Sequence, residues 1–146
     1  NHYLNPHIDN SHNLDRDMYR RLNLLYYVSP GWKLESGGNF ELWNENLEKP
    51  KTIISLFNRL VVMETNRSSW HSVSKVLSEG KRCCISNYYY SQYSPDNTEY
   101  YHVTSFKGRP EEKIKKIYFN LDNYFRNLVS KIFRVGRGRN LINKQR

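Results

Sequence analysis

Long apolar runs are missing from this sequence, and so is a framework of cysteines. No stretch approaches the roughly 18 consecutive apolar residues of a membrane span, so we expect no such span. Only two cysteines occur, Cys83 and Cys84. Because neighbours on a strand point to opposite faces, a disulfide between them would be strained. We therefore expect two reduced thiols, one facing the core and one facing out, in a reducing compartment, which indicates the cytoplasm.

Acidic residues are scarce toward the end of the chain. Residues 1–106 hold 11 Lys/Arg and 11 Asp/Glu, whereas residues 107–146 hold 12 Lys/Arg and 3 Asp/Glu. The whole net charge of +9 therefore belongs to the C-terminal segment. Such a segment can contact nucleic acid, an acidic partner or a membrane surface, but a solvated helix face followed by a soluble tail is the commoner explanation.

Strand-like segments fill most of the chain, which at 146 residues has the length of one domain. They are short, rich in β-branched and aromatic residues, and separated by turn residues such as Ser29-Pro30-Gly31 and Glu79-Gly80. Many short strands at this spacing are typical of a sandwich or barrel of the jelly-roll type. The expected strands are residues 22–28, 39–43, 52–57, 59–64, 70–73 and 82–90.

A helical pattern replaces the strand pattern after Gly108. Pro110 suits a first helical turn, and acidic residues follow it directly. Apolar residues then recur every three or four positions, so we expect an amphipathic helix packed on the sheet. Its predicted apolar face consists of Ile114, Ile117, Leu121, Phe125, Leu128 and Ile132. The expected organisation is a β core over residues 1–106, a helix of the same domain over 107–135, and a basic tail over 136–146.

Two histidines and a carboxylate form a candidate metal site. His7 and Asp9 are two residues apart, so on an extended backbone both side chains project to the same side. His71 is a candidate third ligand from a remote strand-like segment. Non-haem iron oxygenases hold Fe(II) with two histidines and one carboxylate, which leaves the opposite face of the metal open. Arg82 begins a later strand, where its guanidinium can bind a carboxylate in bidentate fashion.

The order of these motifs resembles the prolyl-hydroxylase-like branch, including the prolyl 4-hydroxylases, of the 2-oxoglutarate/Fe(II) dioxygenases. The resemblance runs from about Tyr3 to Tyr90. The matching segments are Pro6-His7-Ile8-Asp9, Leu24-Leu25-Tyr26-Tyr27-Val28, Ser36-Gly37-Gly38-Asn39-Phe40-Glu41-Leu42, Phe57-Asn58-Arg59-Leu60-Val61-Val62, His71-Ser72-Val73 and Lys81-Arg82-Cys83-Cys84-Ile85-Ser86. Relatives usually carry helices and a strand ahead of the His-x-Asp motif, whereas six residues precede it here, so we expect a fragment or a minimal version.

The resemblance implies a double-stranded β-helix, a cupin-like jelly roll, that uses Fe(II), 2-oxoglutarate and O₂, with ascorbate as a possible reductant. It implies that His7, Asp9 and His71 bind the iron and perform the catalytic role. It further implies that Arg82 binds the distal carboxylate of 2-oxoglutarate with the help of the Tyr27 hydroxyl. The remaining implied positions are Ser86 in the cofactor pocket and Tyr88 at the substrate entrance. In relatives the region of Arg20 and Arg21 flanks the substrate opening, so either arginine is a candidate for substrate contact, with Arg21 as the first choice.

Three functions are compatible with these residues. The first is hydroxylation of a prolyl or other amino-acid side chain in a peptide or protein. The second keeps the reaction and changes the substrate to a small metabolite or a nucleic-acid base, for which the basic C-terminal segment is the argument. The third is a truncated, non-catalytic binding module. The oligomeric state does not follow from the sequence.

Overall fold

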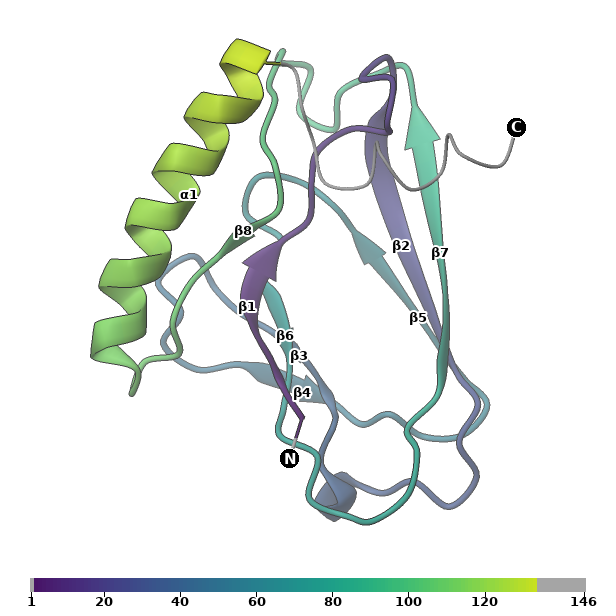
Figure 1. Cartoon of the computed structure of the whole chain (residues 1–146). Helices are drawn as coiled ribbons and strands as arrows, with labels where there is room; N and C mark the ends of the chain where they lie inside the picture. Colours follow the sequence, from purple (N-terminus) through teal and green to yellow (C-terminus); the bar gives the residue numbers. More distant parts are fainter. Residues whose placement is uncertain (1, 134–146) are drawn as a thin grey trace.

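The computed structural model describes residues 2–133, which form two antiparallel sheets and one long helix (Figure 1). The larger sheet has the order β4-β3-β6-β1-β8, and its strands are Lys51–Ile53 (β4), Phe40–Leu42 (β3), His71–Val73 (β6), Leu4–Ile8 (β1) and Ser105–Phe106 (β8). The smaller sheet has the order β5-β2-β7, with Arg59–Glu64 (β5), Tyr19–Tyr27 (β2) and Cys84–Ser91 (β7). A short 3-10 helix, Leu34–Ser36 (η1), precedes β3. The predicted basic tail, residues 136–146, lies outside the described residues.

All six predicted strands are present, and the mainly β class is confirmed. The match is closest for β5, whose bounds are those predicted, and loosest for β4, which ends four residues early. The strands β1 and β8 complete the larger sheet on the far side of β6. The short strand β8 has two residues, too few to show any periodicity in the sequence.

The main apolar cluster lies between the two sheets. Tyr27 of β2, Val61 and Met63 of β5, and Phe40 of β3 pack together, and both sheets therefore contribute to one core. Cys84 packs against this cluster while Cys83 is exposed, and both are free thiols, as expected from their alternation along the strand.

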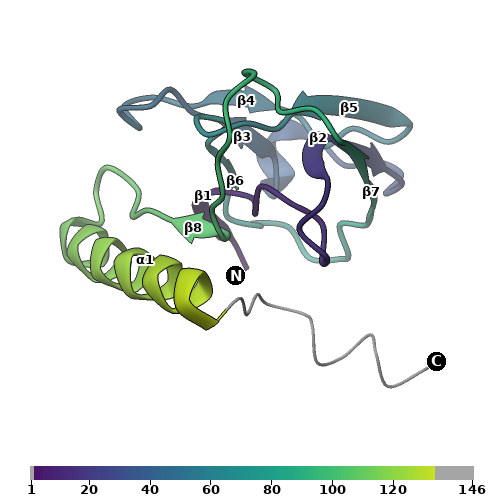
Figure 2. The same ribbon diagram turned by 90° about the horizontal axis from the view of Figure 1, so that it is seen from above.

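Helix α1, Lys113–Phe133, lies within the predicted range 107–135 but begins six residues later, and its orientation corrects the prediction. All six residues of the predicted apolar face are exposed, from 41% at Leu128 to 85% at Ile114. The helix instead turns a polar side toward β8, where Asn123 and Asn127 bond to the backbone. In Figures 1 and 2 it lies beside β8 at the margin of the larger sheet. No helix among residues 2–133 is long and apolar enough to cross a membrane.

The physical reason for this orientation is the open edge of β8. This strand pairs with β1 on one side only, so the outward backbone groups of Phe106 need other partners. The side-chain amide of Asn123 provides both, because its Oδ1 accepts from the Phe106 N–H at 3.0 Å and its Nδ2 donates to the Phe106 carbonyl at 2.6 Å. Hydrogen bonding to a sheet edge requires polar side chains, and the apolar side of the helix is thereby turned outward.

Candidate metal centre

Three metal-ligating side chains meet between the sheets. His7 on β1 and His71 on β6 are directly paired across the larger sheet, and their ring centroids are 4.1 Å apart. Asp9 follows β1 immediately and brings a carboxylate to the same place, with Oδ1 3.9 Å from Nε2 of His7 and Oδ2 3.6 Å from Nε2 of His71. One ligand atom from each residue lies within 4.8 Å of the others. The structure therefore brings together the three residues that the sequence singles out.

Both histidines are held with Nε2 toward the centre of this group. Nδ1 of His7 is 3.0 Å from the Asn5 carbonyl, and Nδ1 of His71 is 2.9 Å from the Ser69 carbonyl. A carbonyl only accepts, so each Nδ1 carries the proton and each Nε2 offers its lone pair. Burial, reinforced by the neighbouring His71, lowers the pKa of His7 from 6.5 to about 4, so its ring is neutral at neutral pH.

The carboxylate of Asp9 is kept ionised by its surroundings. Burial by itself would raise its pKa, but the nearby His71, Arg20 and His7, together with a hydrogen bond from Asn23, hold the pKa of Asp9 below its usual range. Two imidazoles and one carboxylate are the donor set of the facial triad that binds Fe(II) in non-haem oxygenases. The residues present therefore fit such a metal.

A second group of predicted residues lies along the inner face of the smaller sheet. The Arg82 guanidinium is 5.7 Å from the centre of the Tyr27 ring, and Tyr27 is almost fully buried. Burial raises the pKa of the Tyr27 hydroxyl, so it stays a neutral hydrogen-bonding group. Among residues 2–133, the half-buried Arg82 guanidinium forms no hydrogen bond or ion pair, so it is available to an anionic ligand. Gly38 makes room for it, since a Cβ there would lie 2.9 Å from Cδ of Arg82.

Ser86 and Tyr88 share the face of β7 that carries Cys84, and both are exposed. The ring of Tyr88 lies under the guanidinium of Arg20, 4.1 Å away. The segment 92–104, which joins β7 of one sheet to β8 of the other (Figure 2), is anchored to the β5–β6 connection because Arg67 pairs with Asp96.

Arg21, predicted to contact substrate, points elsewhere. Its Nη1 donates to the Tyr93 carbonyl at 3.1 Å, whereas the preceding residue, Arg20, is buried with Nη1 3.3 Å from Oδ2 of Asp9. The cause is a register shift in the β2–β7 pairing between Arg20 and Leu22. Strict alternation from Tyr27 backward selects Arg21, and the extra residue of a bulge moves the inward position to Arg20.

Asn23 is a site residue that the sequence analysis missed although a signal was present. It alternates with Leu25 and Tyr27, which face the core, so a polar side chain there is buried and needs a partner. The partner is Asp9, whose Oδ2 accepts a hydrogen bond from the Asn23 amide. No comparable signal indicates that Arg20 rather than Arg21 is the inward residue, because the sequence pattern does not reveal the bulge between Arg20 and Leu22.

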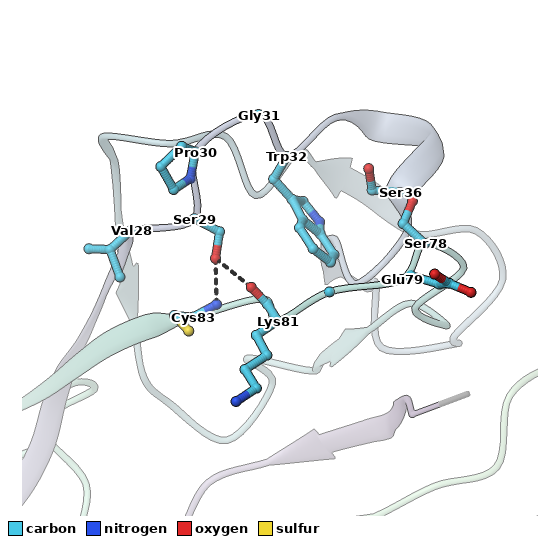
Figure 3. A pocket seen from close by; sticks show the side chains of 11 residues that line it. Val28, Ser29, Pro30, Gly31, Trp32, Ser36, Ser78, Glu79, Lys81 and Cys83 are labelled. Atoms are coloured by element: carbon cyan, nitrogen blue, oxygen red, sulfur yellow. Dashed lines mark hydrogen bonds between the residues drawn. The ribbon is translucent and has the colours of Figure 1, made fainter.

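A separate pocket of about 460 Å³ opens beside the loop that leads to Arg82 (Figure 3). Trp32 forms part of its wall, and Ser29 ties its two lining segments together by donating to the Lys81 carbonyl at 3.0 Å and accepting from the Cys83 N–H at 2.7 Å. None of its lining residues belongs to the His7, Asp9 and His71 group.

Comparison with known proteins agrees with the donor set of the candidate metal site. The sequence model of the 2OG-Fe(II) oxygenase superfamily matches residues 1–90. Two curated relatives are named prolyl 3-hydroxylase OGFOD1. The protein of Mus musculus is 36% identical over 77 residues, and that of Xenopus laevis is 32% identical over 77 residues. Each alignment covers 49% of this chain, but only 14% of the mouse protein and 15% of the frog protein.

Proposed function

We propose a hydroxylase function for this chain, which belongs to the 2-oxoglutarate/Fe(II) oxygenase superfamily. Its target would be a C–H bond of a prolyl or other amino-acid side chain in a peptide or protein. The observation that carries the proposal is the convergence of His7, Asp9 and His71 inside the segment that the family matches. We also propose that the two facing sheets form a double-stranded β-helix over residues 1–106, and that the segment 107–135, which contains α1, belongs to the same domain. The two free thiols support a reducing compartment, for which we propose the cytoplasm.

Iron would be held by Nε2 of His7, Nε2 of His71 and the carboxylate of Asp9. When bound, the metal and 2-oxoglutarate supply the oxidation of a C–H bond by O₂, with release of succinate and CO₂, and ascorbate would serve as a reductant. Arg82 would bind and orient the distal carboxylate of 2-oxoglutarate through its forked N–H groups, and the Tyr27 hydroxyl would add a hydrogen bond. The Asn5 and Ser69 carbonyls hold the histidine protons on Nδ1, which keeps both Nε2 atoms free for the metal.

The substrate is the less constrained part of the proposal. Both relatives are named prolyl 3-hydroxylases, so C3 of a prolyl residue is the position to test first, and the expected 4-hydroxylase-like branch is not confirmed. Ser86 would line the cofactor pocket, and Tyr88 would line the substrate entrance, since both lie on the inner face of β7. For contact with the substrate we propose Arg20 as a candidate beside the predicted Arg21, because Arg20 is the one next to Asp9.

The test is turnover with defined components. The protein is incubated with Fe(II), ascorbate, 2-oxoglutarate and proline-containing peptides, while succinate and a peptide mass gain of one oxygen atom are measured. We expect both products, and we expect His71→Ala to abolish them. The exposed His2 provides the matched control, since His2→Ala removes a histidine outside the metal group.

Two other outcomes identify the alternatives. If calorimetry shows that the protein binds metal and 2-oxoglutarate but no succinate forms, the chain is a non-catalytic binding module. Succinate formation with metabolites or nucleic acid in place of peptides indicates another substrate, and nucleic-acid binding must weaken as salt rises if the basic segment contacts phosphates.

A further inference from the structure

Two side chains of β2 engage one oxygen of the Asp9 carboxylate. The amide of Asn23 donates to Oδ2 of Asp9, and Nη1 of Arg20 lies 3.3 Å from the same atom. Each carboxylate oxygen faces one histidine, since Oδ2 lies 3.6 Å from Nε2 of His71 and Oδ1 lies 3.9 Å from Nε2 of His7. The two oxygens differ in their other partners: Oδ2 is engaged by both β2 side chains, whereas Oδ1 accepts no hydrogen bond from residues 2–133. We call Arg20 and Asn23 together the Asp9 clamp.

The Asp9 clamp is itself fixed in place. The Arg20 side chain is buried, and its Nη2 lies 3.0 Å from Oδ1 of Asn10 and 3.4 Å from the Tyr90 hydroxyl. Its guanidinium also stacks on the ring of Tyr88. Asn23 is buried too, with only 3% of its surface exposed. Side chains held by several partners lose little further freedom when they bind Asp9, so they can define the orientation of its carboxylate.

The backbone of β2 places both residues on the inner face. Asn23 is inward by simple alternation with Leu25 and Tyr27, whereas Arg20 is inward because the register shift between Arg20 and Leu22 inserts one extra residue. Bulges often re-aim a side chain next to an active site. Arg21, the residue in the shift, is consequently free of the metal group and bonds to the Tyr93 carbonyl.

We propose that Arg20 and Asn23 are positioning residues that keep Oδ2 of Asp9 out of the metal coordination and reserve Oδ1 for the metal. The inference rests on the proposed function, since it requires that His7, Asp9 and His71 bind a metal. Carboxylates bind metals through one oxygen or both. Binding through one oxygen preserves the three open positions of a facial triad, and binding through both fills one of them.

Charge and geometry make opposite predictions for Arg20. A guanidinium near a divalent cation repels it, so removal of the charge alone would strengthen metal binding. Loss of an outer partner that orients a ligand typically weakens metal binding by about 10–100-fold. The sign of the change therefore separates a positioning role from a purely electrostatic one.

The experiment measures Co(II) affinity and the visible absorption of bound Co(II) in the whole chain. The variants are Asn23→Ala and Arg20→Gln, and the matched control is Arg21→Gln, which removes the same charge from the neighbouring position. We expect Asn23→Ala and Arg20→Gln to weaken Co(II) binding by about 10–100-fold, and Arg21→Gln to leave it unchanged. We also expect the visible absorption of bound Co(II) to change in the two variants and to stay as in wild type in Arg21→Gln, because a second carboxylate oxygen would take one of the positions that other ligands otherwise occupy.

Thermal unfolding of the metal-free proteins checks that each variant folds. If either Asn23→Ala or Arg20→Gln does not fold, the Co(II) affinity of the remaining variant tests the proposal. Unchanged Co(II) affinity in Asn23→Ala, or tighter binding by Arg20→Gln, overturns the positioning role. Absence of Co(II) binding by the wild-type protein would instead overturn the proposed function, so the two failures are distinguishable.

Discussion

Acid should destabilise this protein through His7, and the size of the effect follows from its burial. His7 is only 6% exposed, and its pKa falls from 6.5 to about 4 in the folded protein. As the pH falls, His7 therefore binds a proton near pH 6.5 in the unfolded chain but only near pH 4 in the folded chain. Since the unfolded state binds more protons in this window, the free energy of unfolding falls as the pH falls.

The magnitude follows from the separation of the two pKa values. A fall from 6.5 to about 4 corresponds to about 3 kcal/mol of stability, present above pH 6.5 and lost by about pH 4. His12 and His102, whose pKa values are also lowered mainly by burial, add loss in the same direction. Asp9 contributes only at lower pH, because its pKa is held below 3.8 and its stabilisation disappears as the pH falls through that lower value.

The assay compares urea unfolding of wild type and His7→Gln between pH 7 and pH 4.5 without metal. We expect wild type to lose about 2–3 kcal/mol more than the variant over this range, because Gln has no proton to gain. His2→Gln, at an exposed position, serves as the control and should follow wild type. Equal losses in wild type and His7→Gln would refute the reasoning, since the acid sensitivity would then belong to other groups.

Three further predictions concern single contacts. Gly38→Ala should weaken 2-oxoglutarate binding measured by calorimetry, because its Cβ meets Cδ of Arg82, whereas Gly31→Ala has a similar positive φ and open space and should leave that binding intact. Arg109→Met should lower the free energy of unfolding, measured by urea unfolding, by about 3–5 kcal/mol. The reason is that Glu41, the buried partner of Arg109 at 2.8 Å, then lacks a counter-charge. The double variant Arg109→Met/Glu41→Gln should recover much of this loss. Asn123→Ala should lower the free energy of unfolding by about 1–3 kcal/mol, because the N–H and carbonyl of Phe106 lose their hydrogen-bond partner. Ile117→Gln, on the outer side of α1, should change it by less than about 0.5 kcal/mol in the same assay. A larger effect of Ile117→Gln than of Asn123→Ala would contradict the orientation of the helix.

The spacing of residues in the sequence already indicated much of the candidate site. His7 and Asp9 share a side because they are two residues apart on an extended backbone, and His71 pairs directly with His7 across the larger sheet. The strands β2 and β5 were predictable because each is a short run rich in apolar, β-branched or aromatic residues next to turn residues. Local periodicity and the chemistry of the ligand types need no knowledge of the rest of the fold.

Other features depended on contacts between distant segments. The sequence by itself determined that α1 is a helix with one apolar side, but only the unpaired edge of β8 decided that its polar side, through Asn123, faces the sheet. Likewise, the sequence placed two arginines near the site, but the irregular pairing of β2 with β7 decided that Arg20 rather than Arg21 reaches Asp9. Periodicity records which residues share a side, whereas the partner that each side meets is set by the edges and register shifts of the assembled sheets.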